Sequence, residues 1–256
     1  MIKFLFVLQA LLIGLNISLT AVADPLKRAV VISSYQSEDF YNSVSGLLQK
    51  YVKNGQVDYR GLQREKPALD RLVQQIGQFK LSNAAASERK AFYINAYNIL
   101  VLHQVLENYP IKSVMNVPGF FDKQKFRVAG EQLTLNELEK ERLMLPFKDA
   151  RIHLALVCAA KSCPPLLNTA YRPQEVEDQL QTQTNAALNN PQFIRVITKT
   201  KEAGVSEIFK WYADDFLVHS PSVISYINKY RSKPIPKGYT VRYYNYDWNL
   251  NDVSEK

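Results

Sequence analysis

The sequence predicts an α+β fold, namely a helix-rich single domain around a small, mostly antiparallel sheet with a buried central strand. Apolar residues recur at helical spacing over most of the chain, whereas the stretches with strand character are short and scattered. These stretches do not alternate regularly with the helices, as a parallel βαβ sheet would require. The 46% of hydrophobic residues excludes a disordered chain and is enough for one large core.

The first residues have the three parts of a secretory signal peptide. Met1-Ile2-Lys3 gives a positive start, residues 4–15 form a short apolar core, and Ala21-Val22-Ala23 ends the segment. The apolar core is shorter than the roughly 20 residues of a membrane-spanning helix, although an uncleaved anchor is the alternative. We expect a signal peptide over residues 1–23, with cleavage after Ala23. The mature protein is then periplasmic or secreted and has no transmembrane anchor.

Residues 24–36 lack a clear period and are expected to form a lead-in segment, so the single domain spans residues 37–256. Ser37 and Ser87 are predicted helix caps. The helix after Ser87 is apolar nearly all round, which is typical of a helix buried in the middle of a domain. The expected helices span about residues 37–53, 69–77, 87–108, 134–143, 174–189, 206–216 and 223–230. The expected strands lie in residues 126–133, 151–158, 193–198 and 239–248, and residues 202–204 are expected to form a turn.

Two asparagines lie inside the apolar helix. Asn95 and Asn98 are three residues apart and therefore on adjacent surface. A buried amide needs hydrogen-bond partners, so the pair either belongs to a structural network or orients a catalytic group. His103, on the same helix, is expected to be a core histidine.

Residues 151–163 are the stretch that best indicates chemistry. His153, one of only three histidines, lies in the expected buried strand, which runs into a loop that holds both cysteines, Cys158 and Cys163. Rigid scaffolds often present reactive groups on such loops. An unbroken strand would place His153 and Cys158 on opposite faces, so a direct ion pair between them requires a bend before Cys158.

Three interpretations of the cysteines compete. Cys158 and Cys163 form a disulfide in an oxidising compartment, or one of them is a thiolate whose pKa is lowered by a cation such as His153 or Lys161. In the third interpretation both thiols stay reduced and buried, or hold a metal together with His153. The spacing matches no common zinc pattern, so we expect no metal and no cofactor.

Acidic residues near expected helix ends are further candidates. Glu137 is predicted to complete a capping box with Thr134. Glu139 has no such role and is either a surface acid or a site residue. Asp214 and Asp215 are expected at the end of a helix, where acids oppose the helix dipole, so they should have a specific partner such as Arg or Lys.

The net charge of +8 favours acidic partners. The C-terminal region is basic and also holds several tyrosines and Trp248; its basic residues are Lys229, Arg231, Lys233, Lys237 and Arg242. No phosphate-binding loop or dinucleotide-binding glycine motif occurs, and an exported protein is not expected to bind nucleic acid. The expected partner is a small molecule or an anionic envelope polymer, and the oligomeric state does not follow from the sequence.

Several motifs together resemble one family. They are Val57-Asp58-Tyr59, residues 91–98, residues 133–139, residues 151–164, residues 208–216 and residues 246–251. The sequence resembles the family known as domain of unknown function 547 over about residues 40–251, which supports a single domain but implies no activity. The chain departs from the family pattern in two segments. The family often has Ile-Glu-His where this chain has Leu138-Glu139-Lys140, and Asn where this chain has Val157.

The leading hypothesis is an exported cysteine-dependent hydrolase or acyltransferase of the cell envelope. Cys158 or Cys163 is the nucleophile, His153 the base or orienting group, Asn95 a polar stabiliser and Glu139 a candidate acid. The alternative is a non-catalytic module, stapled by a Cys158–Cys163 disulfide, that binds an anionic envelope polymer or a protein partner. The C-x4-C spacing argues against a thioredoxin-like exchange role.

Overall fold

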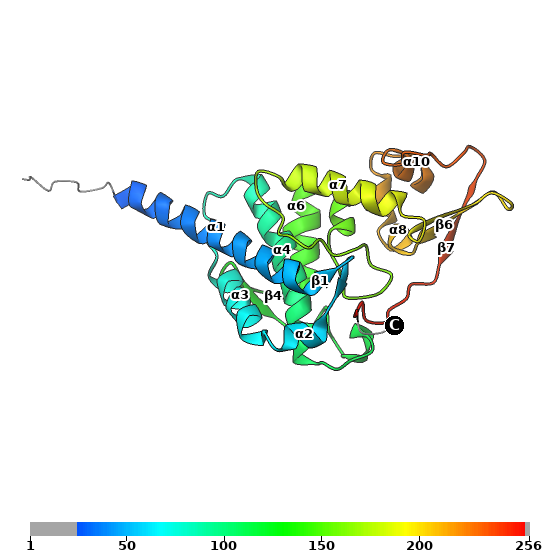
Figure 1. Ribbon diagram of the computed structural model, residues 1–256. Coiled ribbons are helices and arrows are strands. Elements are labelled where there is room, and N and C mark those ends of the chain that lie inside the picture. The colour runs from blue at the N-terminus through cyan, green and yellow to red at the C-terminus, as the bar shows by residue number, and fades with distance from the viewer. Residues whose placement is uncertain (1–24, 254–256) are drawn as a thin grey trace, which may run out of the picture.

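The computed structural model describes the backbone of residues 25–253 and the side chains of residues 37–253. Helices form most of its regular structure and three small sheets accompany them, which confirms the α+β class (Figure 1). The predicted signal peptide and its cleavage site lie outside the described residues. Within the described part, no helix combines the length and the apolar character needed to cross a membrane.

Helix α1 (Pro25–Tyr51) extends from one end of the molecule (Figure 1). It begins at Pro25, so the backbone of the expected lead-in is helical and Ser37 lies inside a helix that it was predicted to cap. Proline suits the first position of a helix, where its missing N–H has no partner to lose. The second half of α1 buries Phe40, Val44 and Leu48 against the body, mainly beside α3 (Lys66–Gln78).

Helix α4 (Ala86–Glu107) runs through the middle of the core, as its all-round apolar sequence predicts (Figure 1). It contacts α3, the π-helical segment η2 (Leu138–Met144) and α7 (Val176–Asn189). Each fully buried Leu, Ile or Phe on it contributes about 1.5–3 kcal/mol of transfer free energy. The helix starts after Ala85, so Ser87 is not its cap.

Three sheets of two or three short strands are present in the described chain. Two are antiparallel hairpins, and the third has the order β5-β6-β7 with β5–β6 antiparallel and β6–β7 parallel. The predicted turn at residues 202–204 is wrong, because small buried residues there form β6. The strands are β1 (Val52–Lys53), β2 (Gln56–Val57), β3 (Phe126–Val128), β4 (Glu131–Leu133), β5 (Ile194–Ile197), β6 (Glu202–Ser206) and β7 (Thr240–Tyr244).

Short helices complete the two ends of the fold. Asp58 caps α2 (Tyr59–Gln63), accepting a hydrogen bond from Gly61 N. The predicted helix over 206–216 is divided into α8 (Ile208–Trp211) and α9 (Ala213–Leu217), and α10 (Val223–Asn228) follows. The remaining helical segments are η1 (Val114–Asn116), α5 (Leu135–Glu137) and α6 (Leu145–Phe147).

The predicted buried central strand over residues 151–158 is wrong. Asp149 caps a 3-10 helix there, η3 (Ala150–Leu154), and the residues that follow join no sheet. The apolar run is nevertheless buried, because η3 lies where two hydrophobic clusters meet: Ile152 belongs to one and Leu154 to the other. A short segment that is apolar on all sides has no period, so the sequence pattern could not distinguish a helix from a strand.

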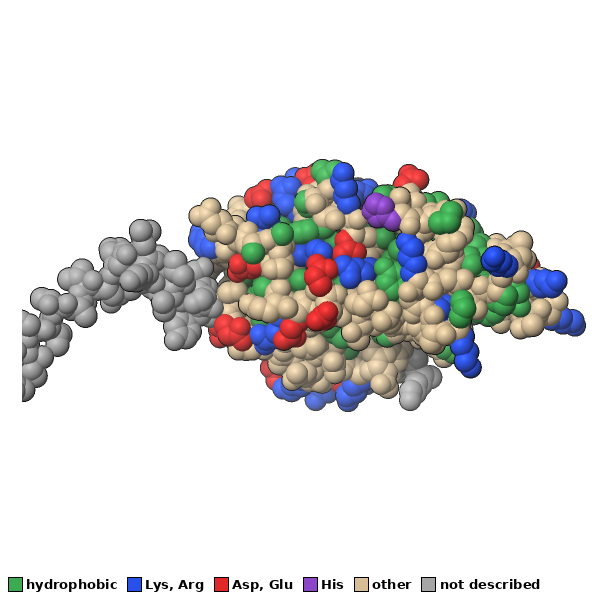
Figure 2. All heavy atoms as spheres, turned by 90° about the horizontal axis from the view of Figure 1, so that it is seen from above, with side chains coloured by type: hydrophobic (Ala, Val, Ile, Leu, Met, Phe, Trp, Pro, Cys, Tyr) green, Lys and Arg blue, Asp and Glu red, His purple; other side chains and the backbone are tan. Residues whose placement is uncertain are grey.

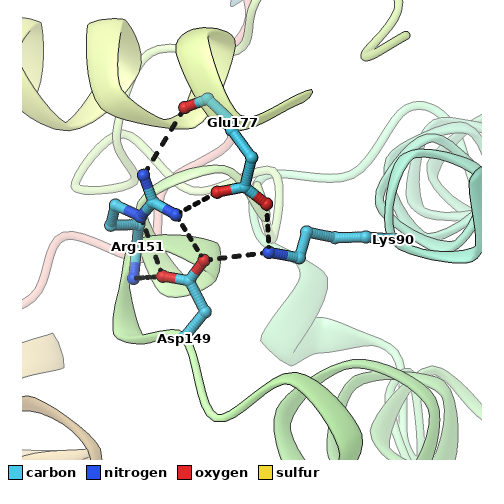
Figure 3. A network of polar contacts seen from close by, with 4 residues as sticks. All are labelled: Lys90, Asp149, Arg151 and Glu177. Atoms are coloured by element: carbon cyan, nitrogen blue, oxygen red, sulfur yellow. Dashed lines mark hydrogen bonds and ion pairs between the residues drawn. The ribbon is translucent and has the colours of Figure 1, made fainter. Parts of the chain in front are cut away.

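A four-residue ion network fixes η3 against the helices around it (Figure 3). Lys90 Nζ of α4 lies 3.2 Å from Asp149 Oδ2 and 2.6 Å from Glu177 Oε1 of α7. Arg151 Nη2 lies 2.8 Å from Asp149 Oδ2 and 2.5 Å from Glu177 Oε2. The network therefore ties α4, η3 and α7 together directly before the cysteine segment.

Candidate functional site

A cavity of about 540 Å³ opens beside the cysteine segment. Its walls come from η1 and the loop after it, η2, η3, α8 and the C-terminal segment. Most of the lining is apolar, and seven aromatic side chains contribute to it: Tyr97, Phe120, Phe121, Trp211, Tyr212, Tyr246 and Trp248. An apolar cavity with a few convergent polar groups is the usual form of a small-molecule site.

Three of the predicted site residues meet in this aromatic cavity. Glu139, His153 and Cys158 all line it, with Asp122 and Asn136 as further polar groups. Cys163 lines a separate, more polar cavity of about 810 Å³ on the other side of the cysteine loop.

The two cysteines are free thiols whose sulfur atoms lie 2.9 Å apart. They meet because the loop between them turns sharply at Ala159, whose φ of 63° is in the left-handed region. A residue with a Cβ is sterically strained in that region, and such strain often occurs at functional sites. The chain also bends before Cys158, because the 3-10 helix ends at Leu154, and His153 and Cys158 line the same cavity without an ion pair between them.

The C-terminal segment holds this loop in place. After β7 the chain runs back along the cysteine loop towards β2, where Val57 and Asp252 form a bridge (Figure 1). Lys161 N donates to Asn249 O at 2.8 Å, and Asn251 N donates to Ala159 O at 2.9 Å. This pairing brings Tyr246 to the thiols, a site residue that the sequence reasoning assigned only to a terminal strand.

Sγ of Cys163 is surrounded by hydrogen-bond donors. The backbone N–H of Cys158 and the hydroxyl of Tyr246 both lie 3.2 Å from it and donate to it, and Sγ of Cys158 is its third hydrogen-bond partner. Burial by itself raises the pKa of Cys163, but these hydrogen bonds outweigh it and hold the pKa below the usual thiol value. The pKa of Cys158 is raised, first by the hydrogen bond to Cys163 and then by burial. Of the two thiols, Cys163 is therefore the one that loses its proton more readily.

Asn98 positions the backbone that leads into Cys158. Its Nδ2 donates to Ala155 O at 3.0 Å and its Oδ1 accepts from Val157 N at 2.9 Å. Both groups are buried, so this amide satisfies backbone atoms that have no sheet partner. Asn98 thereby connects the central helix to the site.

Asn95 makes the corresponding contacts with a different loop. Its Nδ2 donates to Ala91 O and Tyr171 O, both at 2.8 Å, and its Oδ1 accepts from Tyr171 N at 3.0 Å. The amide therefore anchors the chain before α7, and it lines neither of the cavities beside the cysteines. These contacts are those of a structural hydrogen-bond network, the first of the two interpretations given for the asparagines.

His153 pairs with carboxylates and not with sulfur. Its Nε2 lies 2.8 Å from Asp215 Oδ2 and its Nδ1 lies 3.8 Å from Glu139 Oε1, while its ring stacks on Tyr212 at 3.8 Å. The hydrogen bond with His153 is the main reason that the pKa of Asp215 is lowered. Asp214 and Asp215 lie in the first turn of α9, so the expectation of a helix end is wrong, and the partner of Asp215 is His153 in place of Arg or Lys.

Glu139 is buried, with 6% exposure, which excludes the surface acid considered from the sequence. It lies in η2, whose π-helical hydrogen bonding widens the helix locally, a feature that is frequent at functional sites. The capping box of Thr134 and Glu137 starts this helix as predicted. Burial and the Glu139 carboxylate raise the pKa of Tyr212, which hydrogen-bonds to Glu139. Lys140, which departs from the family pattern, is exposed in a neighbouring cavity.

One cluster among the described residues has metal-ligand chemistry. Ligand atoms of Asp70, His103 and Glu107 lie within 4.8 Å of one another, far in sequence from the cysteines. Lys66 Nζ lies 3.0 Å from Asp70 Oδ1 and 2.7 Å from Glu107 Oε1, so an ammonium group already pairs with both carboxylates. Burial is the main reason that the pKa of His103 is lowered. These contacts describe an ion-pair cluster better than a metal site.

One family model matches part of the chain. Residues 81–186 match the model of the family described as "Protein of unknown function, DUF547". Within these residues the match confirms the resemblance drawn from the sequence motifs, and it includes α4, η2 and both cysteines. No curated protein and no solved structure matches the chain.

Proposed function

We propose that this protein is an exported, cysteine-dependent acyl hydrolase or acyltransferase of the cell envelope. The observation that carries the proposal is the thiol pair: Cys158 lines a ligand-sized aromatic cavity, and Sγ of Cys163 lies 2.9 Å from Sγ of Cys158. A nucleophile beside its own base is the common arrangement of covalent catalysis.

In the proposed acylation step, Cys158 is the nucleophile and Cys163 the base. Sγ of Cys158 bonds to the substrate carbonyl carbon while its proton passes to Sγ of Cys163 and the carbonyl electron pair moves to oxygen. Collapse of this intermediate breaks the bond to the leaving group, which takes the proton from Cys163. The product is a thioester on Cys158, with Cys163 again a thiolate.

In the proposed second step, Glu139 acts on the acceptor. Water or another acceptor attacks the thioester while Glu139 takes its proton, and the proton then returns to the departing thiolate of Cys158. His153 is a positioning residue in this scheme, because its nitrogens face Glu139 and Asp215. Asn95 has no part in it, since its amide is bound to the Tyr171 backbone.

The test is acylation by p-nitrophenyl acetate under reducing conditions, followed by intact mass and peptide mapping. We expect one acetyl group on Cys158, none in Cys158→Ser, and slower acylation in Cys163→Ala, by about 10²-fold. Acetylation of Cys163 in preference to Cys158 would reverse the assigned roles. If neither thiol of the folded protein is acetylated, the proposal is wrong.

The short distance between the sulfurs also supports the disulfide-stapled binding module as a second candidate. Lys199 and Lys201 are exposed at the tip of the β5–β6 hairpin, and Figure 2 shows Lys and Arg side chains at that end of the molecule. This candidate predicts no free thiol in protein purified without reductant, and salt-sensitive retention on an anionic polysaccharide. Alkylation of both thiols in such a preparation would exclude it.

A further inference from the structure

The charges in the aromatic cavity are opposite in sign to those of the whole chain. The net charge of the protein is +8, but the cavity is lined by two carboxylates, Asp122 and Glu139, and none of the described residues that line it is Lys or Arg. Among the described residues of the lining, His153 is the one that carries positive charge when protonated, and its Nε2 already pairs with Asp215. An anionic ligand would therefore meet carboxylates, whereas a cation would be attracted.

Aromatic faces in the same wall favour a cation as well. Trp211, Tyr246 and Trp248 contact one another, with ring centroids 4.8–5.8 Å apart. Trp211 is 45% exposed, although an indole gains from being covered. A cation within about 6 Å of such a ring is attracted by its electron-rich face, most strongly where water is excluded.

From these features we infer that the cavity binds a compact organic cation, an alkylammonium group on an apolar body. The apolar body packs on the rings, and the ammonium group lies towards Glu139. This inference deepens the proposed function and rests on it in one respect, namely that the amine is the acyl acceptor. Glu139 then takes one proton from the ammonium group, and the neutral amine attacks the thioester on Cys158. An amide forms, and the second proton goes to the departing thiolate.

Tryptophan fluorescence can measure this binding directly, because the chain has two tryptophans and both line the cavity. Three probes of similar shape but different charge are titrated: benzylamine, benzyl alcohol and benzoate. We expect benzylamine to change the emission at about tenfold lower concentration than benzyl alcohol, and benzoate to bind most weakly. Equal binding of the amine and the alcohol, or tightest binding of benzoate, would overturn the inference.

A matched pair of variants locates the charge that is responsible. Glu139→Gln should abolish the preference for benzylamine over benzyl alcohol, whereas Glu141→Gln, an exposed position in the same segment, should keep it. If Glu139→Gln does not fold, Asp122→Asn at the exposed rim provides the same comparison and should reduce the preference. If the variant that folds still prefers benzylamine over benzyl alcohol as strongly as wild type does, the placement of the ammonium group is refuted.

Binding and acylation are separate measurements, so the two proposals can fail separately. Benzylamine binding is measured without an acyl donor, so it needs no reaction at the thiol. Acylation without selective amine binding would remove the inference and leave the proposed function. Selective binding without acylation would remove the proposed function and leave a binding site for cations.

Discussion

Removal of the Asn98 amide tests whether the central helix positions the cysteine segment. Asn98→Ala leaves two buried backbone groups, Ala155 O and Val157 N, without their partner. Each unpaired group lowers the free energy of unfolding by about 1–3 kcal/mol, and the better helix propensity of alanine offsets about 0.5 kcal/mol. The free energy of unfolding should therefore fall by about 2–5 kcal/mol, as measured by urea denaturation with tryptophan fluorescence.

Asn95→Ala is the matched control for this variant. It lies on the same helix, is similarly buried and also loses hydrogen bonds to a backbone, but that backbone is at Tyr171. Both variants should lose stability, whereas only Asn98→Ala should also change the rate at which the thiols are acetylated. A loss below about 1 kcal/mol in Asn98→Ala, or equal acetylation rates in the two variants, would refute the reasoning.

Three further predictions concern the ion network, the thiolate and the capping box. The pKa of Asp149 is lowered because ion pairs and hydrogen bonds with Arg151 and Lys90 outweigh its burial. Its contribution to stability is therefore present above pH of about 4 and is lost as the pH falls further. Asp149→Asn should lower the free energy of unfolding by about 3 kcal/mol at pH 7 and weaken its dependence on acidic pH in urea melts. An unchanged dependence below pH of about 4 would contradict this. Tyr246→Phe removes a donor to Cys163, so alkylation of the thiols by iodoacetamide should begin at higher pH, and an identical pH profile would show that the hydroxyl does not stabilise the thiolate. Thr134→Ala should lower the unfolding free energy by about 1 kcal/mol, and no change in a urea melt would mean that the capping box is not needed.

Local patterns in the sequence were sufficient for much of the fold. The buried helix α4, the hairpin at residues 126–133 and the capping box at Thr134 were all predicted from residues close in sequence, because periodicity and capping are local properties. The same reasoning selected Cys158, Cys163 and His153 from rare residue types, and Cys158 and His153 line one cavity.

Only the tertiary structure decided what those residues contact. Tyr246 reaches Cys163 from 83 positions away, and Asp215 reaches His153 from 62 positions away, distances over which no sequence period acts. Residues 150–154 form a helix and not the predicted strand. The two surrounding clusters bury this segment, so its apolar sequence does not distinguish a helix from a strand. The sequence by itself thus determined the helices with a clear local pattern, such as α4, and the reactive residue types. The fold decided their partners, because burial and long-range contacts exist only once the chain has closed on itself.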